Sequence, residues 1–137
     1  MSTPLDDKLR QAASQWMRRA KSNLALAKEA KLDDVVLEDL CFEAQQAAEK
    51  GIKAVLVLRG IDVPKTHEIA RLLDLLEQSG LKVPDEIWKA HALTDYAVEA
   101  RYPNRIMPVT EEEYPQAILL AEKVVQWAAE IISAGQK

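Results

Sequence analysis

The sequence predicts an all-α protein, built as an antiparallel helical bundle with short connections. Apolar residues recur at three- and four-residue spacing in five separate segments, and no segment alternates convincingly as a strand would. Prolines and glycines stand between these segments, where helices begin or end. A chain of 137 residues is most simply one domain, over residues 1–137, able to bury roughly two thirds of its unfolded surface.

The first helix is predicted over about residues 4–30. Thr3 is a good N-cap, Pro4 suits the first helical position, and Asp6 places an acid in the first turn. One apolar stripe then runs along the segment, made of Leu5, Leu9, Ala13, Trp16, Ala20, Leu24 and Ala27. The second helix is predicted over about residues 36–59, with Gly60 ending it.

The third helix is predicted over about residues 67–79, capped by Thr66 and ended by Gly80. A fourth helix is predicted from Pro84 to just before Pro103, followed by the longest loop, residues 102–108.

A fifth helix begins after this loop. Thr110 and Glu113 have the spacing of a capping box. Pro115 then lies one residue too deep, which favours a start nearer Glu112. The acids Glu111 to Glu113 suit the positive end of a helix dipole, so they do not indicate a metal site.

The second helix has one face of mostly small residues. On a helical wheel this face contains Leu37, Cys41, Ala44, Ala48, Gly51 and Val55. Gly51 costs about 1 kcal/mol of helix propensity relative to alanine. Close approach of another helix would offset that cost, so Gly51 is predicted to face a closely packed helix.

The opposite face of the second helix mixes polar and apolar side chains, namely Phe42, Gln45, Gln46, Glu49, Lys53 and Leu56. Faces of this kind with an aromatic anchor are common at protein–protein contacts. The alternative is an exposed helix face with two ordinary surface hydrophobes. Residues of this face form the candidate interface: Phe42, Gln46, Glu49 and Lys53.

Composition and charge exclude several classes of protein. Cys41 is the single cysteine and no Cys/His cluster has zinc-ligand spacing, so neither an internal disulfide nor a structural metal is expected. The longest apolar runs are too short to span a bilayer and MSTPLDDKLR lacks a signal pattern, so a cytoplasmic location is expected.

The net charge is −4, but residues 1–31 hold seven basic and three acidic side chains. An acidic chain is not a general nucleic-acid binder, although a local basic patch is compatible with this charge. Arg18, Arg19 and Lys21 lie within one helical turn, where a solvated helix face is the simpler interpretation.

Four segments together resemble the HEPN domain family. FEAQQAAEKGIKAVL, residues 42–56, is similar to the signature helix of that family. WMRRAKSNLALAKEA from Trp16, PKTHEIARLLDLL from Pro64 and LTDYAVEARYP from Leu93 are similar to three further segments, in the same order and spacing. The resemblance covers nearly the whole chain.

The resemblance implies an up-and-down four-helix bundle with an additional short helix, usually assembled as a dimer. Family members are often encoded beside a minimal nucleotidyltransferase, with which they act as a toxin–antitoxin pair. Many are metal-independent ribonucleases with a motif after the fourth helix: an arginine, four to six intervening residues and a histidine. The arginine steadies the scissile phosphate, and the histidine assists proton transfer at the 2′-hydroxyl.

The sequence departs from this ribonuclease motif. Arg101 matches the arginine, but the histidine positions hold Ile106, Met107 and Pro108. From Arg105 the corresponding positions hold Thr110, Glu111 and Glu112, and neither His67 nor His91 follows an arginine at the required spacing. The motif is therefore absent.

Two groups of residues are candidates for binding phosphate. Arg101, Tyr102 and Arg105 combine two guanidinium groups with an aromatic ring on a proline-containing loop, although Arg101 could instead pair with an acid of a neighbouring helix. Lys65 and His67 stand where backbone N–H groups at a helix start could hold a phosphate, although a cap followed by a first-turn residue is the simpler interpretation.

The expected function is therefore a HEPN-like interaction module. We expect a homodimer that pairs with a nucleotidyltransferase, binds nucleotide or RNA weakly, and needs neither cofactor nor metal. The alternative is a divergent metal-independent ribonuclease that uses another residue in place of the missing histidine.

Overall fold

The protein is all-helical, as the sequence predicts. The computed structural model describes residues 3–29, 33–98 and 108–134, and these ranges contain no strand. The α-helices are α1 (Pro4–Ala27), α2 (Leu37–Leu58), α3 (Ile69–Gln78), α4 (Asp85–Trp88), α5 (Asp95–Val98) and α6 (Glu113–Ala134), with a 3₁₀ helix, η1 (Lys89–Thr94), between α4 and α5.

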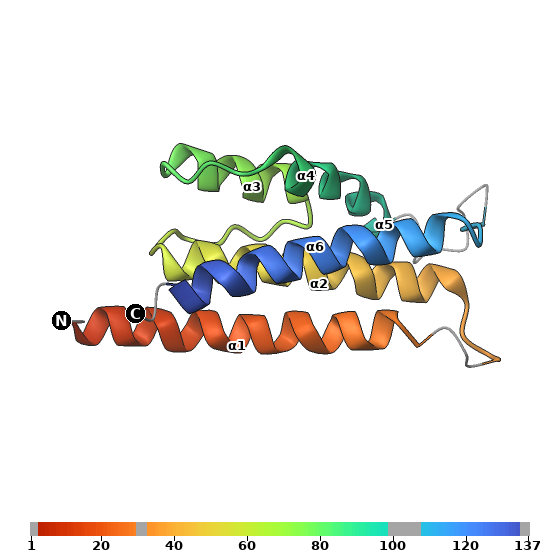
Figure 1. Cartoon of the computed structure of the whole chain (residues 1–137), viewed down its shortest axis with the longest axis horizontal. Helices are drawn as coiled ribbons and strands as arrows, with labels where there is room; N and C mark the ends of the chain where they lie inside the picture. Colours follow the sequence, from red (N-terminus) through yellow and green to blue (C-terminus); the bar gives the residue numbers. More distant parts are fainter. Residues whose placement is uncertain (1–2, 30–32, 99–107, 135–137) are drawn as a thin grey trace.

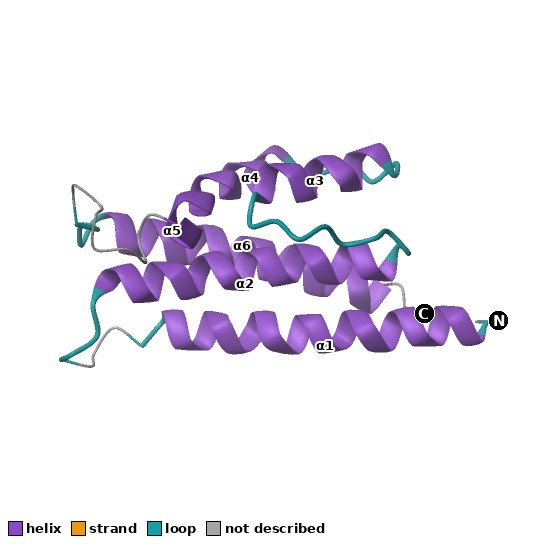
Figure 2. Cartoon of the chain, turned by 180° about the vertical axis from the view of Figure 1, so that it is seen from behind, coloured by secondary structure: helices purple, strands orange, loops and turns teal. Residues whose placement is uncertain are grey.

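The two other long helices, α1 and α6, pack against α2. The contacts of α2 with α1 and with α6 are the most extensive in the molecule, and α1 also touches α6. Figure 1 shows α3, α4 and α5 as a second layer on the other side of α2 and α6 from α1. The segment between α2 and α3 runs back along α2, so α3 takes the direction of α2 (Figures 1 and 2).

The start of α1 and the ends of α2 and α3 follow from local sequence. The Asp6 N–H donates to Thr3 Oγ1 at 3.0 Å and the Thr3 N–H donates to Asp6 Oδ2 at 3.1 Å, which completes a capping box. Gly60 after α2 has φ 73° and Gly80 after α3 has φ 96°. Both lie in the left-handed region that favours glycine, so the predicted helix ends are confirmed.

Small residues let α2 and α6 approach closely. Ala44, Ala48 and Gly51 are buried in the core. A Cβ placed on Gly51 would lie 3.7 Å from Ala128 Cβ and 3.8 Å from Val124 Cγ1, both on α6. Gly51 therefore faces a closely packed helix, as predicted.

The start of α3 differs from the prediction. The helix begins at Ile69 with Glu68 as its N-cap residue, two residues later than expected. Thr66 Oγ1 accepts a hydrogen bond from the Glu68 N–H at 3.1 Å, while the Ile69 N–H donates to Thr94 Oγ1 at 3.1 Å. Thr94 of η1 thus accepts a hydrogen bond from a backbone N–H group in the first turn of α3, a contact that the local sequence does not indicate.

The predicted fourth helix is broken into α4, η1 and α5. Ile87, Ala90 and Leu93 are buried and recur at intervals of three residues. A 3₁₀ helix has three residues per turn, so it keeps such positions on one face, whereas an α-helix would rotate them apart.

The start of α6 agrees with the predicted capping box. The Glu113 N–H donates to Thr110 Oγ1 at 3.1 Å, and the Thr110 N–H donates to Glu113 Oε2 at 2.7 Å. The helix begins at Glu113, which leaves Pro115 within its first turn, where the lack of an N–H costs no helical hydrogen bond.

Candidate functional site

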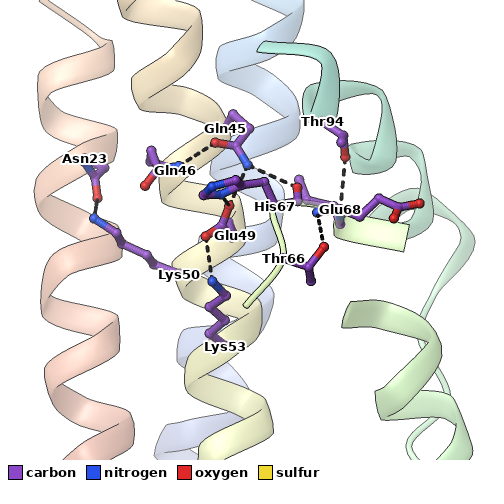
Figure 3. Close-up of polar contacts among 11 residues, drawn as sticks. Asn23, Gln45, Gln46, Glu49, Lys50, Lys53, Thr66, His67, Glu68 and Thr94 are labelled. Carbon is purple, nitrogen blue, oxygen red and sulfur yellow. Dashed lines mark hydrogen bonds and ion pairs between the residues drawn. The ribbon is translucent and has the colours of Figure 1, made fainter. Parts of the chain in front are cut away.

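A line of buried polar side chains runs along α2. Gln45 is 0% exposed, Glu49 3% and Lys53 8%, and they are the buried polar or charged residues among the described part of the chain. Their spacing of four residues places them on one side of the helix. Figure 3 shows this side facing the segment that precedes α3. We call Gln45, Glu49, Lys53 and the His67 side chain beside them the polar cluster.

Glu49 is the centre of the polar cluster. Its Oε1 accepts hydrogen bonds from Gln45 Nε2 and His67 Nδ1, both at 2.8 Å, and its Oε2 accepts one from Lys53 Nζ at 2.7 Å. Burial alone raises the pKa of this carboxyl, but the bonds from Lys53, Gln45 and His67 outweigh burial and hold the pKa below its usual value. Glu49 is therefore a carboxylate at neutral pH.

The carboxylate orients the ring of His67. An ionised carboxylate only accepts hydrogen bonds, so Nδ1 of His67 carries the proton that it shares with Glu49. The other ring nitrogen, Nε2, has no hydrogen-bond partner among the described residues. The His67 side chain is 60% exposed, whereas that of Glu49 is 4% exposed. The cluster thus connects a buried anion to a solvent-facing imidazole.

The polar cluster also attaches the segment before α3 to α2. Gln45 Nε2 lies 3.5 Å from the His67 carbonyl oxygen, and Gln46 Nε2 donates to Gln45 Oε1 at 2.7 Å (Figure 3). Since the hydrogen-bonding groups of Gln45 and Glu49 have partners, their burial does not leave them unsatisfied. Lys65, by contrast, is exposed.

A second set of polar contacts joins α2 to α1. Lys53 Nζ lies 5.7 Å from the centre of the Trp16 ring, within the range of a cation–π contact. Lys50 Nζ donates to Asn23 Oδ1 at 2.9 Å, and Asn23 Nδ2 donates to Glu43 Oε2 at 2.6 Å. Trp16 packs against the core as predicted, and its contact with Lys53 has no signal in the sequence.

The structure separates the residues of the candidate interface. Glu49 and Lys53 are buried within the chain itself, and Gln46 and Phe42 are half-buried. The segment before α3 of the same chain covers the polar line of the second helix, so Glu49 and Lys53 do not lie on the surface that the candidate interface was expected to offer. A role for the four residues in contacts with a partner chain stays a prediction.

Phe42 lines an apolar groove of about 460 Å³, together with Leu26, Val35 and Leu40. The acids Glu29, Asp39 and Glu43 also line this groove. Leu26 is 52% exposed, so the groove presents apolar surface to solvent.

Arg101, Tyr102 and Arg105 lie outside the described residues, and so does the histidine position at Ile106 and Met107. His91 is exposed in η1. Within residues 3–29, 33–98 and 108–134, no group of three or more His, Cys, Asp or Glu side chains could hold a metal ion. No helix in these ranges is both long and apolar enough to cross a membrane.

Part of the polar cluster is predictable from the sequence. The spacing of Gln45, Glu49 and Lys53 is visible in the sequence, and His67 stood out as one of two histidines. The sequence does not indicate that His67 meets Glu49, because the two residues are 18 positions apart and approach only when the segment before α3 folds back along α2.

Comparison with known proteins agrees with this architecture. The sequence profile of the HEPN domain matches residues 13–132. A crystal structure of an archaeal HEPN homologue is similar with a TM-score of 0.70 and 28% sequence identity, over 88% of this chain and 97% of that chain. Comparison with curated proteins gives no match. Since the profile spans most of the sequence, the chain belongs to the HEPN domain family.

Proposed function

We propose that this HEPN domain is an interaction module without catalytic activity of its own. In this proposal it pairs with a minimal nucleotidyltransferase in a toxin–antitoxin-type pair, and it binds nucleotide or RNA weakly. Such a role implies a cytoplasmic location. Membership of the family supports the general role, and the sequence around Arg101 supports the lack of catalysis.

The observation that carries the proposal is the loss of a proton-carrying side chain. At the positions where ribonucleases of the family are expected to hold a histidine, this chain has Ile106, Met107 and Pro108. None of these side chains titrates, so none can take the proton of a 2′-hydroxyl. Arg101 remains and would still contact phosphate.

An RNA degradation assay tests the lack of catalysis. The purified protein, incubated with RNA in the presence of a metal chelator, is expected to leave the RNA intact. Weak, salt-sensitive binding of RNA that decreases in Arg101→Ala is expected beside it. Chelator-resistant cleavage that Arg101→Ala abolishes would contradict the proposal.

Co-purification tests the partner. The protein is expected to form a complex with a minimal nucleotidyltransferase encoded in the adjacent gene when the two are expressed together. An adjacent gene of another class, or two proteins that elute separately at micromolar concentration, would remove the nucleotidyltransferase from the proposal.

Self-association is the third part of the proposal. Phe42 and the exposed Leu26 give α1 and α2 a shared apolar surface, and we propose that it contributes to a homodimer. Sedimentation at micromolar concentration is expected to show a dimer that Phe42→Glu weakens. Leu119→Glu is the matched control, since Leu119 is 53% exposed on α6 outside this groove. A dimer that survives Phe42→Glu would place the interface elsewhere.

A divergent metal-independent ribonuclease is the second candidate function, and one observation favours it. His67 has an exposed ring whose Nδ1 is held at 2.8 Å by the Glu49 carboxylate. Catalytic histidines are often oriented by a carboxylate in this way. This candidate predicts chelator-resistant cleavage that is lost in His67→Asn and retained in His91→Asn.

A further inference from the structure

A groove between α1 and α6 combines cations and hydroxyls. It has a volume of about 300 Å³ and is lined by Ser14, Met17, Arg18, Lys21, Ala129, Ile132 and Ser133. Ser14, Arg18 and Lys21 follow the i, i+4, i+7 pattern of one helical stripe. This stripe adjoins the buried stripe of Ala13, Met17 and Ala20, so helix geometry places it at the edge of the core.

The cations of this groove have no acidic partner among the described residues. Neither Arg18 nor Lys21 forms an ion pair with a residue in the described part of the chain, and the residues that line the groove include no acid. The groove therefore concentrates positive charge on a protein whose net charge is −4.

The flank of the bundle formed by α1 and α2 is different, although it also carries basic residues. There Lys53 meets Glu49, and Lys50 bonds Asn23, which itself bonds Glu43. Basic residues on that flank are thus accompanied by acids. The described residues that line the α1–α6 groove, by contrast, include no acid.

We propose that the α1–α6 groove binds a phosphate group of an RNA backbone. The Arg18 guanidinium can donate two parallel hydrogen bonds to phosphate oxygens, and Lys21 adds a second positive charge one turn away. The hydroxyls of Ser14 and Ser133 supply further donors. Two cations with several donors match an anion that has more oxygens than a carboxylate, which favours phosphate over an acidic peptide.

The groove contacts the backbone and not the bases. No aromatic side chain lines it, so it offers no ring on which a base could stack. The proposed binding is therefore independent of sequence and sensitive to salt. This inference rests on the RNA-binding part of the proposed function and assigns it a surface far from the Arg101 segment in sequence.

The test compares two double variants of the full chain. Arg18→Ala with Lys21→Ala removes both groove cations, and Arg71→Ala with Lys82→Ala removes two exposed cations on α3 and in the loop after it. Binding of a labelled single-stranded RNA is measured between about 50 and 200 mM salt. The groove variant is expected to bind about ten-fold more weakly than wild type, with a salt slope reduced by about 0.7 because the contact to one phosphate is lost. The control variant is expected to retain most of the affinity.

The inference is overturned by unchanged RNA affinity in the groove variant, by an equal loss in the control variant, or by no RNA binding by the wild type. Displacement of the RNA by polyglutamate at matched charge concentration would also overturn it, since the groove would then bind anions in general. Co-purification of the groove variant with the nucleotidyltransferase checks that its fold is intact and keeps the partner role separate from this result.

Discussion

The two sides of α2 are buried in different ways. Towards α6 the helix presents Ala44, Ala48 and Gly51, whose contacts are apolar and whose fit depends on small size. Towards the segment before α3 it presents Gln45, Glu49 and Lys53, whose burial depends on named hydrogen-bond partners. The stability of the first side depends on the volume of its side chains, whereas that of the second depends on each hydrogen-bond partner being present.

Two ion pairs of equal length show how burial decides what happens when one partner of the pair is removed. Lys53 Nζ to Glu49 Oε2 and Lys28 Nζ to Glu122 Oε2 both measure 2.7 Å. The side chains of the first pair are 10% and 4% exposed, and those of the second are 47% and 43% exposed. Water replaces a lost partner in the exposed pair but has little access to the buried one.

The largest expected effect comes from removing the buried carboxylate. Glu49→Ala leaves Lys53 and Gln45 buried without their partner, so we expect the free energy of unfolding to fall by about 3 kcal/mol. The matched control, Glu122→Ala, breaks the exposed pair and should change it by less than about 1 kcal/mol. Denaturant titration measures both, and similar losses in the two variants would show that the polar cluster is solvated.

On the apolar side of α2, stability is expected to depend on the size of the side chain at position 51. Gly51→Leu forces extra atoms against Ala128 and Val124, and we expect a loss of about 1–3 kcal/mol despite better helix propensity. Gly51→Ala adds one Cβ at ordinary contact distance, so it should raise stability by up to about 1 kcal/mol. A leucine variant that melts at or above the wild-type temperature would contradict the packing described here.

A smaller effect is expected at the exposed end of the polar cluster. His67→Ala removes one hydrogen bond to Glu49 while Gln45 and Lys53 remain, so we expect a loss of about 1 kcal/mol. The other histidine, His91, is exposed in η1, and His91→Ala should be nearly neutral. Equal effects of the two substitutions on the melting temperature would remove His67 from the cluster.

The smallest expected effect is on acid stability, because burial and hydrogen bonding shift the pKa of Glu49 in opposite directions. The pKa of Glu49 is lower in the folded state than in the unfolded chain. The stabilising contribution of Glu49 is therefore present when the pH is above the unfolded-state pKa, and it is lost as the pH falls through the folded-state pKa. Between about pH 5 and pH 3, the stability advantage of the wild type over Glu49→Gln should therefore shrink. An advantage that is constant or grows with acidification would contradict the lowered pKa.

Features that depend on a few neighbouring residues follow from local sequence. The Thr3–Asp6 and Thr110–Glu113 caps and the glycines at positions 60 and 80 act within one turn of their own helix, so local rules predict them. The small-residue face around Gly51 is equally visible, because helical periodicity is encoded in the spacing of residues.

Features that join distant segments of the chain arise only when those segments pack together. Thr94 satisfies the start of α3 from 25 residues away, and this contact replaces the cap predicted at Thr66. The break of the predicted fourth helix follows from which side chains the neighbouring helices bury. The polar line of α2 became a connected cluster only when the segment before α3 placed His67 over Glu49. A buried charge is stable only beside its partner, and the partner's position is set by the path of the whole chain.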